Sequence, residues 1–288
     1  MTDGRRIPFT VALRHPVLSV TTRTGWLIEG EAGWGEWSPL PSWSGAERAA
    51  AERAAREAAA HPYPEPQRQS VPVNTMVPRV PPAVAARMAV ASGCSTVKVK
   101  AGDADGEARV AAVREAVGPD VRIRVDANGA WDLEEAVNAL ARLRAFGIEL
   151  VEDPVPTLAE MARLRRRIPL PVGAEMPIRT LDDVAELIRL DAADVLVIKP
   201  QRIGGIRASL RAAEMAGRPV IVSSALETSV GLSACLAVAA ALPDSPYAHG
   251  IGTASLLAED VTARPLLPAG GRLVARRVEP DLLVATPR

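Results

Sequence analysis

Cysteine is scarce in this chain of 288 residues: Cys94 and Cys235 are the two in the sequence, and they lie far apart outside any CxxC motif. This argues against a disulfide scaffold and indicates a reducing compartment, so we expect a cytoplasmic protein. Net charge is also missing, because 34 basic residues balance 34 acidic ones. No overall field would attract nucleic acid or an anionic membrane, so neither partner is expected and a charged substrate must be recognised locally.

Long apolar runs are absent as well. The N-terminal stretch MTDGRRIPFTVALRHPV has no apolar run of signal-peptide length, so secretion is not expected. The most apolar segment, residues 230–242, is too short to span a bilayer and is interpreted as a buried helix. The three histidines, His15, His61 and His249, are widely separated and form no ligand pair, which favours ordinary structural roles.

A repeated plan is present from about Val71 onward: a short β-branched run, a polar residue, a turn and an amphipathic helical stretch. The runs are SVPVNTMVP, STVKVK, VRIRVDAN, IELVEDP, PVGAE, VLVIKP, PVIVSS and YAHGIG. The polar residues that close them recur roughly every 25 residues, the length of one strand plus one helix. Eight such units predict a closed α/β barrel with its active site at the carboxyl ends of the strands.

Helix boundaries between these runs fit the same plan. Asp132 with Glu135, and Thr180 with Asp183, predict capping-box starts. Glycines stand where the helices should end, at positions 118, 147 and 217.

The first 66 residues do not follow the repeat. Residues 7–40 predict strands and turns, with a hairpin in WLIEGEAGWGEWSPL, and an Ala-rich helix over residues 46–60 precedes the linker HPYPEP. We therefore predict an N-terminal capping domain at residues 1–66 and a barrel domain at residues 67–254. A C-terminal segment at residues 255–288 is expected to return to the cap.

Carboxylates close three consecutive predicted strands: Asp126 in VDAN, Glu152 in VEDP and Glu175 in GAEM. Each of them alone could cap the following helix. Three at one rim would repel each other unless a hard divalent cation lies between them. Oxygen ligands suit Mg²⁺ or Mn²⁺ better than Zn²⁺, so the pattern favours a metal site.

Lysines close two other runs. Lys98 and Lys100 are two residues apart, so both side chains point to one face of their strand, and Lys199 ends another strand. Taken alone, the first two could be solvated ends of an edge strand, but a closed barrel has no edge. In a barrel of eight strands, the second and sixth lie opposite each other, so these lysines would flank a substrate. A neighbouring ammonium group would lower the pKa of Lys100.

In this order and spacing, KVK, DAN, EDP, a strand-end Glu and IKP resemble the motifs of the enolase superfamily over essentially the whole predicted barrel. Members of that superfamily pair a Lys or His base with Mg²⁺. The resemblance implies that Asp126, Glu152 and Glu175 bind Mg²⁺ or Mn²⁺. It further implies that Lys100 and Lys199 are the acid/base pair and that Lys98 tunes Lys100. The implied fold is α/β: a TIM-like (β/α)8-type barrel in the modified (β/α)7β form, with a small N-terminal α+β capping domain.

Two further segments narrow the resemblance. GWGEWSPLPSWSG is similar to a cap segment of muconate-lactonising members, and RVDAN with VIKP and VSSALETSVGL resembles the o-succinylbenzoate synthase family. In that family an Arg two residues before the first metal ligand contacts the substrate, which corresponds here to Arg124, although a structural salt bridge remains the alternative. Ser223, Ser224 and Ser229 could bind a carboxylate, or could be buried or capping serines.

The resemblance implies the Mg²⁺-dependent syn dehydration of 2-succinyl-6-hydroxy-2,4-cyclohexadiene-1-carboxylate to 2-succinylbenzoate, a step of menaquinone biosynthesis that passes through an ene-diolate. An N-succinylamino acid racemase or a dipeptide epimerase would use the same lysines. A non-catalytic ligand-binding barrel is the alternative from a different class. The expected partner is a small-molecule carboxylate substrate, and the expected assembly is a monomer or a small homo-oligomer.

Overall fold

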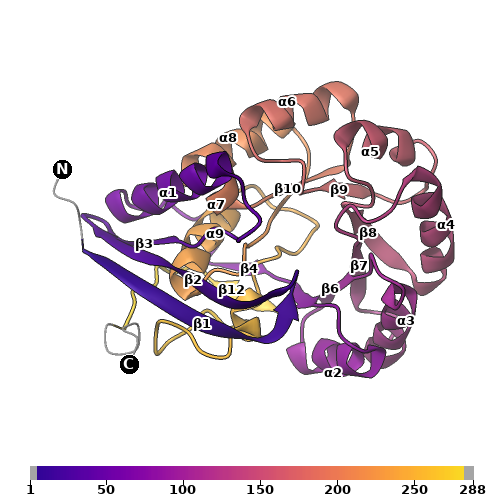
Figure 1. Cartoon of the computed structure of the whole chain (residues 1–288), viewed down its shortest axis with the longest axis horizontal. Coiled ribbons are helices and arrows are strands. Elements are labelled where there is room, and N and C mark those ends of the chain that lie inside the picture. The colour runs from indigo at the N-terminus through magenta and orange to yellow at the C-terminus, as the bar shows by residue number, and fades with distance from the viewer. Residues whose placement is uncertain (1–4, 282–288) are drawn as a thin grey trace.

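The computed structural model describes residues 5–281. Residues 1–4 of the predicted cap and residues 282–288 of the predicted C-terminal segment lie outside that range. Seven parallel strands form one curled sheet in the order β11-β10-β9-β8-β7-β6-β5, with helices around its outer face (Figure 1). The strands are β5 (Thr75–Val77), β6 (Thr96–Lys100), β7 (Arg122–Asp126), β8 (Ile148–Glu152), β9 (Val172–Ala174), β10 (Val195–Ile198) and β11 (Val220–Val222).

The barrel closes through the predicted eighth strand, which is reduced to isolated bridges. His249 bridges Val73 and Gly250 bridges Ser223, both in parallel orientation. The backbone N–H of His249 donates to Pro72 (2.8 Å), and that of Gly250 donates to Val222 (2.8 Å). Seven strand–helix units followed by this closing segment confirm the predicted (β/α)7β form of the barrel.

The prediction of one continuous first strand over SVPVNTMVP is wrong. The segment divides into β4 (Ser70–Pro72) and β5, because β4 pairs antiparallel with the C-terminal strand β12 (Arg272–Val274), whereas β5 pairs in parallel with β6. The chain therefore leaves one pairing partner and joins another within a few residues.

Helices follow the barrel strands as the repeat predicts. They are α2 (Pro82–Ser92), α3 (Gly106–Val117), α4 (Leu133–Leu143), α5 (Leu158–Arg165), α6 (Leu181–Leu190), α7 (Pro200–Ile203), α8 (Ile206–Ala216) and α9 (Ser229–Ala241), with 3-10 turns at Arg144–Phe146 and Thr253–Leu256. The capping boxes predicted at Asp132 and Thr180 are both formed, so the local signals agree with the global fold. The glycines at 118, 147 and 217 each stand directly after a helix.

The N-terminal elements form a separate layer at one side of the barrel (Figure 1). They are an antiparallel sheet of β1 (Arg6–Val17), β2 (Val20–Gly30) and β3 (Gly33–Trp37), covered by α1 (Gly45–Ala60). The predicted hairpin is the β2–β3 pair, with Gly30 opposite Gly33. Helix α1 lies very close to β3: a Cβ on Gly35 would come within 1.9 Å of the Ala55 carbonyl oxygen, so only glycine fits at this position.

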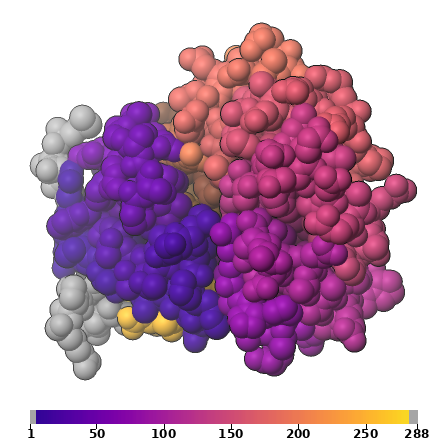
Figure 2. Space-filling view, turned by 45° about the vertical axis from the view of Figure 1, so that its right-hand side comes forward, coloured from indigo at the N-terminus to yellow at the C-terminus, as the bar shows by residue number. Residues whose placement is uncertain are grey.

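The C-terminal segment contacts this layer. Leu257 bridges Leu13 of β1, and the Arg277 guanidinium donates to the Trp34 carbonyl oxygen (3.4 Å) and to that of Ala58. In the space-filling view, the N-terminal part lies directly against the barrel (Figure 2). The domain boundaries at 66/67 and 254/255 stay predictions.

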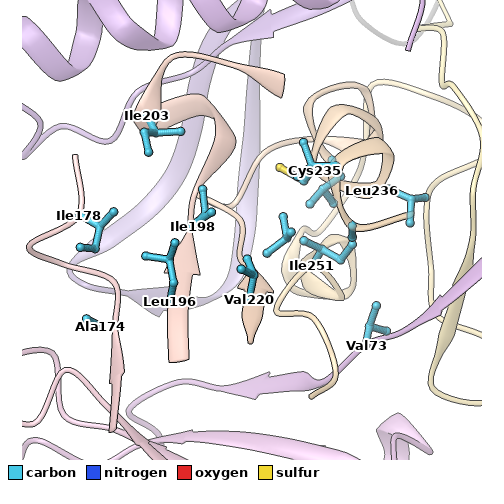
Figure 3. Close-up of a cluster of buried hydrophobic side chains, with 14 of the residues drawn as sticks. Val73, Ala174, Ile178, Leu196, Ile198, Ile203, Val220, Cys235, Leu236 and Ile251 are labelled. Atoms are coloured by element: carbon cyan, nitrogen blue, oxygen red, sulfur yellow. The ribbon is translucent and has the colours of Figure 1, made fainter. Parts of the chain in front are cut away.

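Alternation along the strands separates two hydrophobic regions. On the outer face, side chains of β9, β10 and β11 pack against the surrounding helices, as Leu196, Ile198, Val220 and Leu236 show (Figure 3). Inside the barrel, a cluster of four buried residues fills the space below the rim: Leu150, Val195, Val197 and Ile221. The barrel is thus a packed core, with the lysines and carboxylates of its strands at the carboxyl-end rim.

No helix within residues 5–281 is both long enough and apolar enough to cross a bilayer.

Candidate active site

The strand register brings the predicted reactive residues side by side. Lys100 of β6 pairs with Asp126 of β7, which pairs with Glu152 of β8. Because these residues end their strands and share the inner face, their side chains meet at the rim. Glu175 follows β9, and Lys199 follows β10 on the opposite side of the barrel.

Each predicted metal ligand is paired with a lysine. Lys100 Nζ lies 2.5 Å from Asp126 Oδ2, while Lys98 Nζ lies 2.7 Å from Glu152 Oε1 and 3.0 Å from Asp126 Oδ2. Lys199 Nζ donates to Glu175 Oε2. All of these side chains are largely buried, so the three lysines and three carboxylates form one charged cluster away from bulk water.

The two lysines of β6 differ in the direction in which their pKa values move. Burial lowers the pKa of Lys100, and the neighbouring Lys98 ammonium group lowers it further, although Asp126 opposes both. Burial also acts to lower the pKa of Lys98, but Glu152, Asp126 and Glu175 together raise that pKa above its usual value. Lys98 therefore stays charged, and Lys100 is the better proton acceptor of the two.

The carboxylates divide in a similar way. Burial acts to raise the pKa of Asp126 and of Glu175, but the adjacent lysines outweigh it and hold both pKa values low. For Glu152, burial prevails and raises the pKa, even though Lys98 opposes it. The cluster thus keeps Asp126 and Glu175 as anions, the form that coordinates a metal ion.

Asp153 is a site residue that the sequence reasoning missed. It is fully buried, it has a φ of 45°, and burial followed by the charge of Glu175 raises its pKa well above the usual value. Its Oδ1 accepts from the Glu175 N–H (2.9 Å) and its Oδ2 from the Met176 N–H (3.0 Å). Asp153 is the acidic residue next to Glu152 in the EDP motif, which could have identified it, but strand alternation assigns its side chain to the outer face.

The acidic residues fit a hard divalent cation. Asp126, Glu152 and Asp153 are buried and offer carboxylate oxygens within 4.8 Å of one another. Among the His, Cys, Asp and Glu residues within 5–281, these three form the group whose spacing could hold a metal ion. This group differs from the predicted ligands by having Asp153 in place of Glu175. An oxygen-only donor set matches Mg²⁺ or Mn²⁺ chemistry.

A pocket lies against the cluster. Lys98 and Lys100 line it from β6, Lys199 lines it from the far side of the barrel after β10, and Glu175 lines it after β9. Residues 223–226, which follow β11, form the wall next to Lys199. The N-terminal layer covers it with Val17 at the end of β1, with Leu18 of the β1–β2 turn and with Leu40. Met76, Gly250 and Thr253 complete the lining. A small molecule in this pocket would contact both the charged cluster and the cap.

The predicted substrate-binding serines do not all lie in this pocket. Ser223 and Ser224 line it, and Ser224 Oγ lies 2.7 Å from Thr253 Oγ1. Ser229, the first residue of α9, donates instead to Asp260 (2.6 Å) and accepts from the Leu266 N–H (2.8 Å). This geometry fits the alternative interpretation of Ser229 as a buried structural serine.

Arg124 faces the barrel interior one layer below Asp126. It is 1% exposed, its Nε lies 2.7 Å from Glu149 Oε2, and its Nη1 donates to the Ala248 carbonyl oxygen (2.6 Å). The guanidinium also lies over the Tyr247 ring, 5.4 Å from its centroid. These contacts match the salt-bridge alternative rather than a substrate contact.

His249 and the tryptophans of the cap make structural contacts. His249 is buried, its Nδ1 accepts from the Val222 N–H (3.0 Å), and burial lowers its pKa to about 3. Trp34 and Trp43 are buried, and Trp37 donates its indole N–H to the Arg48 carbonyl oxygen (3.1 Å).

Comparison with known proteins agrees with this geometry. Residues 82–280 match the family model described as enolase C-terminal domain-like, and residues 7–59 match the one described as enolase N-terminal domain-like. Among solved structures, the dipeptide epimerase from Enterococcus faecalis V583 superposes with a TM-score of 0.82, covering 98% of each chain at 22% identity. At that identity the superposition supports the fold alone.

Curated relatives are closer in sequence. The chain is 48% identical to the o-succinylbenzoate synthase of Thermobifida fusca (strain YX), across 94% of this chain and 87% of that protein. It is 43% identical to the o-succinylbenzoate synthase of Mycobacterium tuberculosis (strain ATCC 25618 / H37Rv), across 96% of this chain and 84% of that protein. With its cap, its barrel and its rim of lysines and carboxylates, the chain belongs to the o-succinylbenzoate synthase family of the enolase superfamily.

Proposed function

We propose that the protein is an o-succinylbenzoate synthase. It removes water from 2-succinyl-6-hydroxy-2,4-cyclohexadiene-1-carboxylate and forms 2-succinylbenzoate, which serves menaquinone biosynthesis. The observation that carries the proposal is the buried cluster at the rim, where Lys100 and Lys199 stand on opposite sides of the pocket. The names of the relatives at 48% and 43% identity support the choice of reaction.

Lys100 acts as the base in this proposal. It takes the proton from the carbon that bears the ring carboxylate, and burial together with Lys98 lowers its pKa toward the range in which it can do so. The electrons of the broken C–H bond pass into the carboxylate. Lys199, on the other side, places its ammonium charge near the developing negative charge.

The same lysine completes the reaction. Syn elimination requires the departing hydroxyl to lie on the face from which the proton left, so Lys100 can return that proton as the C–O bond breaks and water leaves. The ring becomes aromatic in this step, which makes the elimination favourable. The main demand on the protein is therefore stabilisation of the charge that forms between the two steps.

A metal ion belongs to this proposal. Asp126 and Glu152 would hold Mg²⁺ or Mn²⁺ together with Glu175, the third ligand that the resemblance implies. When bound, the ion would withdraw negative charge from the substrate carboxylate. Ser223 and Ser224 line the pocket after β11, where they could receive the succinyl carboxylate. A cytoplasmic location and a monomer or small homo-oligomer stay predictions.

The proposal is tested by product identification. Purified protein is incubated with the diene substrate and Mg²⁺, and the product is identified by mass spectrometry as the acid that has lost one water. A parallel sample treated with EDTA should form none until Mg²⁺ is restored. A folded protein that binds Mg²⁺ but leaves the substrate unchanged would refute the proposal.

One observation favours a second candidate on the same scaffold. Because lysines stand on both sides of the pocket, the site could remove and return an α-proton on opposite faces of an N-succinylamino acid, which is racemisation. Incubation of each enantiomer in D₂O would decide. Deuterium incorporation from both, without elimination of the diene substrate, would favour the racemase. The non-catalytic alternative is disfavoured, because the curated relatives are enzymes.

A further inference from the structure

The loop after β11 is held in an unfavourable backbone conformation. We call residues 223–228 the serine loop; it supplies Ser223, Ser224, Ala225 and Leu226 to the wall of the pocket. Leu226 has a φ of 63°, in the left-handed region that residues with a Cβ rarely adopt. A loop with such a residue keeps one conformation only if its surroundings impose it.

Arg23 of β2 holds this loop from the cap. The arginine is 1% exposed, and its Nε donates to the Leu226 carbonyl oxygen (3.1 Å). Its Nη2 donates to the carbonyl oxygen of Ser38, which follows β3. One buried guanidinium thus joins the strained residue of the barrel loop to two neighbouring segments of the cap.

Glu36 of β3 holds the other end of the serine loop. Its Oε1 accepts from the Thr228 N–H (3.1 Å), and its Oε2 accepts from the Gly231 N–H (2.9 Å) and from the Thr228 hydroxyl. Thr228 is at the N-cap of α9, yet its own side chain makes no capping hydrogen bond. Since the first N–H groups of a helix need acceptors, Glu36 of the cap performs the capping of a barrel helix.

We propose that Arg23 and Glu36 are positioning residues through which the cap sets the shape of the substrate-binding wall. The inference rests on the proposed function, in which this wall receives the substrate. Proton transfer is left to Lys100, charge stabilisation to Lys199 and metal binding to the carboxylates, and all of these residues stand on other strands. We call the contacts of Arg23 and Glu36 with the serine loop and the start of α9 the clamp. Loss of the clamp should therefore weaken substrate binding more than it slows the chemical step.

Glu57 offers a matched control. It also belongs to the cap, on α1, and its Oε1 accepts from the Arg207 N–H (3.1 Å) at the start of α8. Glu57 at α8 and Glu36 at α9 are thus both cap carboxylates that accept from the first turn of a barrel helix. The serine loop precedes α9, whereas a Gly-Gly turn (Gly204 and Gly205) precedes α8, so Glu57 makes the same kind of bond away from the proposed wall.

The first experiment measures hydrogen exchange, which needs no activity. In Glu36→Gln, an amide NH₂ replaces one acceptor oxygen, so the Thr228 or the Gly231 N–H loses its partner. Exchange over residues 223–231 should be about tenfold faster than in the wild type. Glu57→Gln should leave that peptide unchanged and affect residues 205–209 instead. Equal exchange over 223–231 in Glu36→Gln and wild type would overturn the inference, as would an equal rise in Glu57→Gln.

The second experiment separates binding from chemistry. In Glu36→Gln, the KM for the diene substrate should rise about tenfold, with kcat within about twofold of wild type and Mg²⁺ affinity unchanged. A fall in kcat at constant KM would contradict the inference. Absence of turnover in the wild type would refute the proposed function instead, and exchange would still decide on the clamp.

Arg23→Gln supplies an independent variant. It releases the serine loop at Leu226 rather than at Thr228, so it should speed exchange over the same residues. If Glu36→Gln does not fold, this variant alone decides: unchanged exchange over 223–231 would overturn the inference.

Discussion

Two layers of inward-facing side chains in the barrel, two residues apart on the same strands, behave differently. The rim layer pairs Lys100, Asp126 and Glu152, and the layer below it pairs Lys98, Arg124 and Leu150. Lys98 reaches up to the rim carboxylates, whereas Arg124 forms a salt bridge with Glu149 of β8. The comparison suggests that the rim layer carries the chemistry and that the lower layer keeps the rim in shape.

The largest effect should come from the rim. Lys100→Ala removes the proposed base, so kcat for the diene substrate should fall by at least about a thousandfold. Mg²⁺ affinity, measured by calorimetry, should stay close to that of wild type, because the predicted ligands are intact. Normal activity of this variant would refute the assignment of Lys100.

The lower layer should respond in stability instead. Arg124→Met leaves Glu149 without its buried partner, and the free energy of unfolding should fall by about 3 kcal/mol. Urea denaturation measures this loss, and the kcat/KM of the folded variant should change little. A large loss of kcat/KM at unchanged stability would show that Arg124 contacts the substrate.

Asp153 supports the rim through the backbone that follows β9. In Asp153→Asn, one oxygen that accepts from the Glu175 or the Met176 N–H becomes an NH₂ group, so the backbone at Glu175 should shift. Mg²⁺ affinity, followed by calorimetry, should fall by about 10- to 100-fold. Unchanged affinity would mean that Asp153 neither holds nor supports the metal site.

The smallest effect concerns the pH dependence of stability at His249, in the segment that closes the barrel. The pKa of His249 is lowered to about 3, so below its usual value of 6.5 the unfolded chain binds a proton that the folded protein does not. Stability is therefore lost as pH falls through this range, by about 1 kcal/mol between pH 7 and pH 5.5 for this one group. In His249→Asn, which keeps an acceptor for the Val222 N–H, this part of the pH dependence of urea denaturation should disappear.

The sequence predicts the charged cluster at the rim well for a physical reason. A charged residue at the end of a β-branched run, repeated once per strand–helix unit, identifies both a strand end and a face. Lys98, Lys100, Asp126, Glu152, Glu175 and Lys199 therefore come together in the structure without any knowledge of the loops.

Residues below the rim or beyond the strand ends were harder to predict. Alternation gives the face of Arg124 but not the direction in which its long side chain turns, so the salt bridge with Glu149 stayed an alternative. Asp153 falls on the wrong face by alternation, because its positive φ changes the direction of the chain. Ser229 follows a loop whose path depends on the cap, through Glu36 and Arg23, and no local pattern encodes that contact.

The central claim is that this site dehydrates the diene substrate with the help of a metal ion, and ultraviolet kinetics test it most directly. The appearance of 2-succinylbenzoate is followed while Mg²⁺ is titrated into metal-free wild-type protein. The account predicts no turnover without metal and a rate that saturates as Mg²⁺ rises. A rate that is the same with EDTA as with Mg²⁺, or no turnover at any Mg²⁺ concentration, would contradict it.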